Sequence, residues 1–185
     1  MDQTSTEHDS TEYGSTVREG TVRGSAEYGK TELGSIEREL HVDASPEVVF
    51  EVLSSPEYIR DWWLAETEIE PIAGATSRLT WIDEETGVST SEPFTVVEAD
   101  PPRRFSFRWV YEADVGDARP GNSLLVVFDL VASGEGTLLR FTETGFRERG
   151  WEAAVLESTY NDHRQGWDFF LPRLADVAKK REAAS

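Results

Sequence analysis

Few side chains in this sequence are placed to do chemistry, and the histidines show this first. His8 lies in a polar N-terminal segment, His41 lies on the polar face of an alternating segment, and His163 precedes Trp167 by one helical turn. His163 with Asp162 could support acid–base work, although a histidine at the surface or stabilising a helix is the commoner case. No three residues of the usual metal-ligating types converge. We therefore expect no catalytic residues, no metal site and no cofactor.

Two charged residues occupy inward positions of otherwise apolar strands. Arg38 shares a strand face with Leu40, and Glu143 shares one with Phe141. A buried charge has to be paired or has to take part in function, because burying it alone is costly. We therefore treat Arg38 and Glu143 as candidate binding residues.

The elements that would position these residues follow from hydrophobic periodicity and helix start signals. Residues 35–44 alternate with period two and predict a half-buried strand. The motif "SPE" at 45–47 and again at 55–57 places an N-cap serine before a proline. Two short helices should therefore follow in series, the second ending near Trp63.

Further strands and a long helix are predicted downstream. Turn residues divide strands near 66–71, 76–83, 88–99, 103–112, 122–132 and 136–145. Because the connections between neighbours are short, the sheet should be antiparallel. From about 151 to 180, apolar residues recur at three- and four-residue spacing, which is typical of a helix, and Pro172 should kink or break it.

Composition limits the classes of partner. The chain has 185 residues, no cysteine and a formal net charge of −18. Missing cysteine excludes disulfides and thiol chemistry, and the strong acidity opposes nucleic acid and anionic membrane surfaces as partners. The N-terminus is polar and acidic, unlike a secretory signal, and no stretch has the length of a membrane span. We expect a cytoplasmic protein.

The N-terminal segment differs in composition from the rest. Residues 1–34 are dominated by Ser, Thr, Glu and Gly and loosely repeat units such as "TEYG" and "TVREG". Such a segment cannot bury enough apolar surface to offset the entropy of ordering. We expect a disordered, acidic, low-complexity tail over 1–34 and one folded domain over 35–182.

Four ordered motifs carry a resemblance to a known superfamily. They are "IERELHVDASPEVVFEVLSSPEYIRDWW", "VVEADPPRRFSFRW", "GTLLRFTETGF", and "GW" followed by "FFLPRL". They resemble the helix-grip superfamily, also called START-like, Bet v 1-like or SRPBCC, and within it the branch homologous to the activator of heat-shock protein 90 ATPase. The resemblance implies an α+β fold: a curved antiparallel sheet of about six or seven strands wraps a long C-terminal helix, with two short helices after the first strand.

The resemblance also implies a ligand cavity between the sheet and the C-terminal helix. Strand parity and helix spacing suggest the residues that would line it: Arg38, Phe50, Trp63, Phe105, Phe107, Trp109, Val126, Phe128, Phe141, Glu143, Trp167 and Phe170. In the resembling fold the first and last strands are neighbours, so Arg38 and Glu143 are predicted to form an ion pair or to contact a ligand. Consecutive helical residues point about 100° apart, so we expect Trp63 at the cavity and Trp62 packed as the hinge of a lid.

Three functions fit these expectations. The first is a binding module, without catalysis, for a small apolar or aromatic ligand, which requires an apolar pocket. The second is an enzyme of the polyketide cyclase or aromatase kind, in which Glu143 or His163 would move a proton. The third is a chaperone-associated interaction domain, which requires an exposed docking face. We expect the first, because the inward positions are mostly aromatic.

Overall fold

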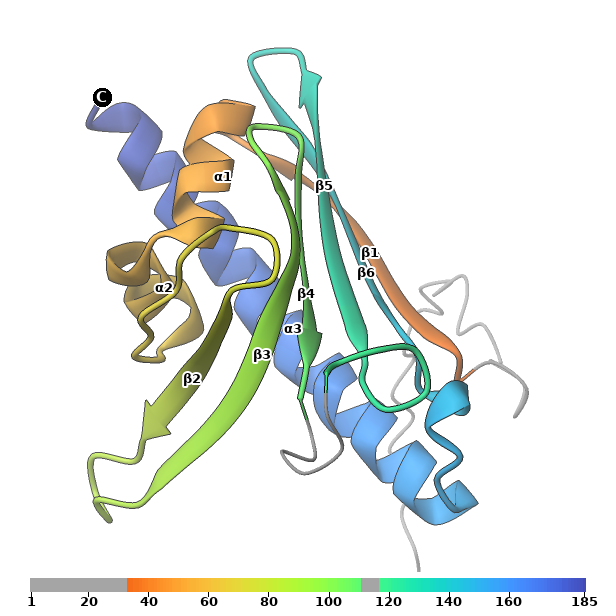
Figure 1. The fold of residues 1–185 in the computed structure, drawn as a ribbon. Helices are drawn as coiled ribbons and strands as arrows, with labels where there is room; N and C mark the ends of the chain where they lie inside the picture. The colour runs from red at the N-terminus through yellow and green to blue at the C-terminus, as the bar shows by residue number, and fades with distance from the viewer. Residues whose placement is uncertain (1–32, 111–116) are drawn as a thin grey trace, which may run out of the picture.

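The computed structural model describes residues 33–110 and 117–185, and its centre is one sheet wrapped on one helix. Six antiparallel strands lie in the order β1-β6-β5-β4-β3-β2. Figure 1 shows the helix α3 crossing the concave side of this curved sheet, with α1 and α2 packed beside its C-terminal half. This is the predicted helix-grip architecture, with the first and last strands paired. Of the predicted tail, only residues 33 and 34 lie within the described residues.

The elements follow the predicted order closely. They are β1 (Ser35–Val42), α1 (Pro46–Ser54), α2 (Pro56–Trp63), β2 (Thr76–Ile82), β3 (Ser89–Asp100), β4 (Arg104–Trp109), β5 (Leu125–Ser133), β6 (Gly136–Thr144), the short 3-10 helix η1 (Arg147–Arg149) and α3 (Ala153–Ala183). The end of the predicted strand 103–112 lies partly outside the described residues.

One predicted strand is wrong. Residues 66–71 do not form a strand and contribute only an isolated bridge, in which Glu66 and Thr80 exchange two backbone hydrogen bonds of 2.9 Å. The chain then reaches Pro71, which has no backbone donor, and turns, with Ala75 N–H donating to Ile72 O at 3.0 Å. The segment therefore passes the edge of β2 without extending the sheet.

The two serine start signals are in the predicted positions, but the hydroxyls do not cap their helices. Ser45 and Ser55 stand at the N-cap before Pro46 and Pro56, and neither makes a side-chain capping bond. Ser45 instead donates from its backbone N–H and its hydroxyl to Glu182 Oε2, at 2.9 and 2.8 Å. The start of α1 is thereby tied to the end of α3.

The helix α3 is continuous for 31 residues and is not broken at Pro172. Proline removes one i to i−4 hydrogen bond from a helix interior. Its neighbours Leu171 and Leu174 are buried against the core while Pro172 itself is exposed. Packing on both sides of the proline therefore holds the helix together. Among the described residues, no helix is both long enough and apolar enough to cross a membrane.

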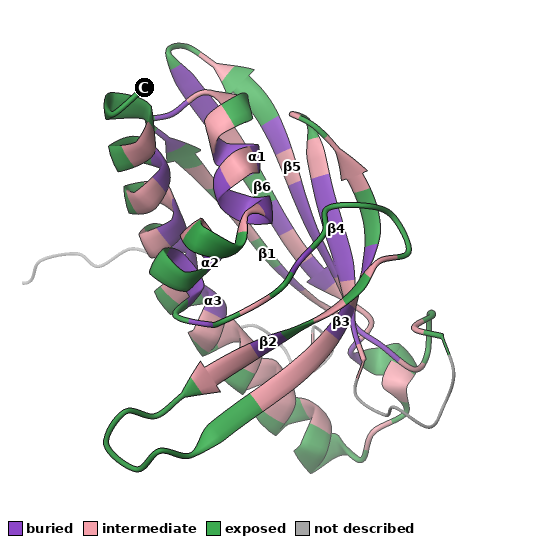
Figure 2. Cartoon of the chain, turned by 60° about the vertical axis from the view of Figure 1, so that its left-hand side comes forward, coloured by how far each residue is buried: buried purple, intermediate pink, exposed green. Residues whose placement is uncertain are grey.

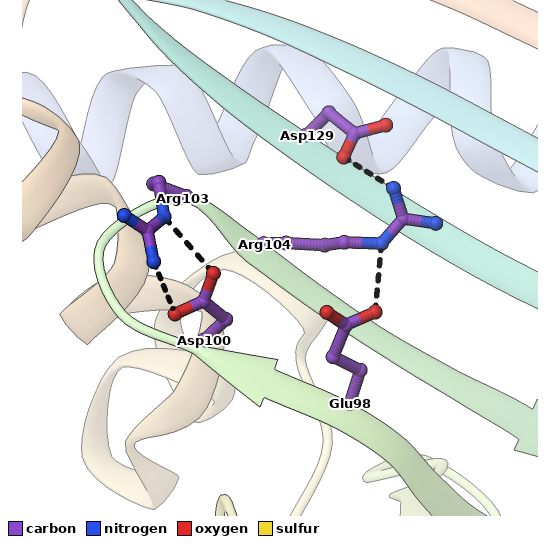
Figure 3. Close-up of polar contacts among 5 residues, drawn as sticks. All are labelled: Glu98, Asp100, Arg103, Arg104 and Asp129. Atoms are coloured by element: carbon purple, nitrogen blue, oxygen red, sulfur yellow. Dashed lines mark hydrogen bonds and ion pairs between the residues drawn. The ribbon is translucent and has the colours of Figure 1, made fainter.

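The two faces of the sheet have opposite chemistry. Figure 2 shows buried residues along the strands of the sheet, on α1 and on the side of α3 that faces the sheet. On the outer side, Arg104 lies between Glu98 and Asp129 at 3.0 and 2.8 Å, and Arg103 pairs with Asp100 at 2.9 Å (Figure 3). A site for an apolar molecule therefore belongs on the concave side.

Candidate functional site

A fully buried carboxylate lies at the end of β6. Glu143 has no exposed surface and its side chain points to the concave side, as its strand parity predicts. Trp109 donates its indole N–H to Oε1 at 3.0 Å, and Trp167 donates its indole N–H to Oε2 at 2.7 Å. His163 Nδ1 lies 2.9 Å from Oε1. Three ring nitrogens from two other elements thus converge on one carboxyl group.

The strand register and the helix repeat bring these groups together. Phe107, Val126 and Glu143 stand opposite one another on β4, β5 and β6, so that Trp109 follows two residues beyond Phe107 on the same face. His163 and Trp167 are four residues apart on α3 and therefore share the face that packs on the sheet. The site is therefore built from neighbouring positions on β4 and β6 and from one turn of α3.

The donors suit an ionised carboxylate. An indole N–H only donates, so both oxygens of Glu143 accept from tryptophan. With Glu143 ionised, His163 Nδ1 must carry the proton in the third bond. These bonds offset part of the cost of burying the charge. The site is therefore a carboxyl group contacted by indole and imidazole nitrogens, and no arginine or lysine of the described residues hydrogen-bonds to it.

Aromatic rings surround the carboxylate. Trp63 is the centre of this cluster, with ring centroids 5.8 Å from Trp109, 5.4 Å from Trp167 and 5.7 Å from Phe107. Trp62 stacks on Trp63 at 4.6 Å and donates its N–H to Val52 O in α1 at 3.0 Å. The rings of the two adjacent tryptophans thus stack on each other rather than diverge, with Trp63 in the cluster and Trp62 also bonded to α1.

The other apolar positions predicted to face inward lie mostly in the same layer. Those that are buried on the concave side or against it are Phe50, Phe105, Phe107, Val126, Phe128 and Phe141. Phe170 differs, because it is only partly buried and its ring contacts Phe169, with centroids 5.1 Å apart. The structure does not bring Phe170 into the group around Glu143.

The predicted ion pair between Arg38 and Glu143 is wrong. Arg38 Nε instead donates to Asp168 Oδ1 of α3 at 2.7 Å, and Glu143 pairs with His163. Ile36, not Arg38, stands opposite Glu143 in the β1–β6 ladder. Arg38 is one step further along the strand, and its long side chain extends to the rim, where a third of it is exposed.

Sequence reasoning missed the role of His163. Its ring lies edge-on to Trp109 at 6.3 Å and edge-on to Phe146 at 5.7 Å, and its side chain is 20% exposed. The four-residue spacing from Trp167 was the available signal, because both residues had to face the same partner. Phe146 lies two residues after the end of β6, where strand parity no longer applies.

Between the sheet and α3 the rings of Trp63, Trp109 and Trp167 contact one another, and a ligand cavity there stays a prediction. The structure has a groove of about 560 Å³ between α2 and α3, lined by Tyr58, Arg173 and Lys180 among others. A second depression, of about 740 Å³, lies beside β2 and includes Arg60 and Glu66. Neither is lined by a predicted binding residue, and the described residues contain no cluster of three potential metal ligands.

The class of protein follows from the sheet, the helix it grips and the pair of short helices: a helix-grip α+β domain. The family model described as "Activator of Hsp90 ATPase homolog 1-like protein" matches residues 43–179. The chain therefore belongs to this family. Among curated proteins, no sequence matches it.

Solved structures with the same fold are distant in sequence. A protein from Nitrosomonas europaea is 14% identical with a TM-score of 0.66, covering 82% of this chain and 98% of its own. The Aha1 dimer from Colwellia psychrerythraea is 18% identical with a TM-score of 0.59, covering 78% and 96%. A putative protein of the dynemicin biosynthetic locus is 20% identical with a TM-score of 0.58, covering 80% of this chain and 48% of its own. These likenesses establish the fold alone.

Proposed function

We propose that this domain binds a small apolar or aromatic molecule between the sheet and α3, beside Glu143. The observation that carries this proposal is the burial of Glu143 within the aromatic cluster, with no exposed surface. Stability alone does not require such a group, because well-packed apolar residues often replace buried ionic groups at no cost. A buried carboxyl group between the sheet and α3 is therefore a candidate for ligand recognition.

The surrounding rings supply the apolar part of the site. Trp63 from α2, Trp109 from β4 and Trp167 from α3 present faces and edges at different angles around one point. Aromatic pairs prefer offset or edge-to-face contacts, so a planar molecule can join such a cluster with little loss of packing. Because these rings already contact one another, we infer that an incoming molecule displaces a side chain. His163, whose side chain is partly exposed, is the candidate.

Native mass spectrometry of the protein purified from its own source tests the proposal. We expect a co-purified small molecule, and we expect Trp109→Phe to lose it, because the substitution removes a ring and a donor beside Glu143. Trp81→Phe is the matched control, since its indole N–H donates to Trp63 O at 2.9 Å and not to Glu143. The proposal fails if no molecule is retained and none from a panel of small aromatic compounds raises the unfolding temperature.

A second candidate is docking on a chaperone of the Hsp90 type. It is favoured by the family to which the chain belongs and by the groove between α2 and α3. Arg173 spans this groove, since it donates to Asp61 O at 3.2 Å and lies over the exposed ring of Phe169 at 5.6 Å. Stimulation of a chaperone ATPase that is lost in Phe169→Ala and kept in Glu143→Gln would favour this candidate over ligand binding.

The enzyme alternative uses the same pair of residues. Glu143 could orient His163 as a general base, as carboxylates do in other enzymes. We rank it lower because Glu143 already accepts from three donors.

A further inference from the structure

We propose that His163 occupies the place of the ligand, and that the ligand is an uncharged aromatic molecule carrying an N–H or O–H donor. On binding, this donor replaces His163 Nδ1 on Glu143 Oε1. The inference rests on the proposed function, which puts a small molecule beside Glu143, and adds the chemical class of that molecule.

The three donors to Glu143 differ in how easily they can leave. Trp109 is 6% exposed and Trp167 is 3% exposed, and both rings are held by other rings of the cluster. The His163 side chain is 20% exposed. The imidazole also contacts the rings of Trp109 and Phe146, but it is the smallest and the most exposed of the three donor rings. His163 is therefore the donor that a ligand can replace.

The position held by the imidazole has a defined shape. The ring planes of Trp109 and Phe146 both stand at 89° to the imidazole ring, with centroids 6.3 and 5.7 Å away. Two edge-to-face contacts with a single flat ring favour another aromatic ring in the same place. An aromatic heterocycle or a phenol reproduces both the flat ring and the donor of His163.

The need for a donor follows from the carboxylate that stays behind. If His163 leaves and the ligand has no donor, Oε1 keeps only the bond from Trp109 while buried. A hydrogen bond to a charged group in such a place changes affinity by roughly tenfold to a hundredfold. An anionic ligand is disfavoured, because it would place a second negative charge against Glu143 in a protein of net charge −18.

Two isomeric ligands test the need for a hydrogen-bond donor separately from the effects of size and apolarity. The compounds 3-methylindole and 1-methylindole have the same formula, but only the first has an N–H. We expect calorimetric titration of the wild-type protein to give at least tenfold tighter binding of 3-methylindole. His163→Ala should bind 3-methylindole more tightly than wild type, because no side chain has to be displaced, and His41→Ala, on the outer face, should leave its affinity unchanged.

The outcomes distinguish the two proposals. Equal affinity for the two isomers overturns the donor requirement and leaves ligand binding standing. An unchanged affinity in His163→Ala overturns the claim that His163 holds the ligand's place. Binding of neither isomer to wild type or to His163→Ala overturns the proposed function itself. If His163→Ala does not fold, the isomer comparison on wild type still decides the donor requirement.

Discussion

At the scale of single residues, Glu143 depends on donors that cannot be exchanged for other groups. Its two oxygens accept from Trp109, Trp167 and His163, which together make a closed set of bonds in the interior. An amide in the same place presents one acceptor and one donor, so the N–H of at least one tryptophan would face another N–H. The site therefore requires a side chain with two acceptor oxygens, which an amide of the same shape does not provide.

We predict that Glu143→Gln lowers the free energy of unfolding by about 1 to 3 kcal/mol, the cost of leaving a buried donor unsatisfied. Urea unfolding followed by tryptophan fluorescence measures the change. Glu135→Gln, in the exposed turn between β5 and β6, is the matched control and should have almost no effect. Equal stability of both variants would show that the interior tolerates an unpaired N–H at this point.

At the scale of elements, α3 is held at its C-terminal end and weakened in the middle. Near its end, Glu182 accepts two bonds from Ser45, and Lys179 donates to Asp43 at 2.8 Å. In its middle, Pro172 interrupts the backbone hydrogen bonds. Each of these features predicts a separate effect on stability.

Replacing the proline should stabilise the protein. Pro172 is exposed, so Pro172→Ala restores a backbone donor without removing core contacts, and we expect a gain of about 1 to 3 kcal/mol in the free energy of unfolding. The exposed substitution Glu157→Ala on the same helix should change stability by less than about 0.5 kcal/mol. A loss of stability in Pro172→Ala, measured by urea unfolding, would mean that the proline shapes the packing of α3 on the sheet.

The contact between α1 and α3 should weaken in acid. The hydrogen bond from the Ser45 backbone N–H, followed by the one from its hydroxyl, holds the pKa of Glu182 below its usual value of 4.5. A carboxyl group with a lowered pKa stabilises the folded state above its usual value, and the stabilisation is lost as the pH falls through the folded pKa. The stability difference between wild type and Glu182→Gln should therefore be largest near neutral pH and should shrink below about pH 4.5.

Urea midpoints between about pH 7 and about pH 3 measure this difference. The exposed Glu157→Gln should track the wild-type protein throughout. A difference that stays constant over the whole range would contradict a role for the ionised Glu182 carboxylate.

The fold could be predicted from the sequence because its signals are local. Period-two alternation, the two "SPE" starts and the three- and four-residue spacing of apolar residues are properties of neighbouring residues. Together they located each described strand and α-helix, but not the short 3-10 helix η1. The error at 66–71 arose because strand-like residues can run beside a sheet edge without pairing, which only tertiary context decides.

The polar part of the site was predictable only in part. Strand alternation correctly predicted that the Glu143 side chain points into the interior. Which residue pairs with it depends on the length of the side chains and on the register between strands, neither of which is a local property of the sequence. Ile36 stands opposite Glu143, and Arg38 lies two residues further along β1, opposite Phe141. At that position Arg38 pairs with Asp168 instead. The open cavity was expected from the fold alone, whereas the size of Trp63, Trp109 and Trp167 decides how much space is left.

At the scale of the whole molecule, the net charge of −18 opposes the compact state through repulsion. The outer face offsets this only with exposed pairs such as Arg104 with Asp129 and Arg140 with Glu39. Such pairs each contribute little. Repulsion between like charges should therefore outweigh them.

Added salt should accordingly stabilise the protein. Raising NaCl from about 10 mM to about 150 mM shortens the screening length from about 30 Å to about 8 Å, which weakens the net repulsion. We expect the thermal unfolding midpoint to rise, with KCl as the control for ion-specific effects. A fall of the midpoint would show that the ion pairs of the outer face dominate.

The central claim is that a small aromatic molecule binds beside Glu143, and the indole N–H signals of the tryptophans test it most directly. Proton–nitrogen correlation spectra recorded during addition of 3-methylindole should shift the signals of Trp109 and Trp167, which donate to Glu143. The signals of Trp62 and Trp81, which donate to backbone carbonyls, should move much less. Signals of Trp109 and Trp167 that stay unchanged at saturating ligand would contradict the account.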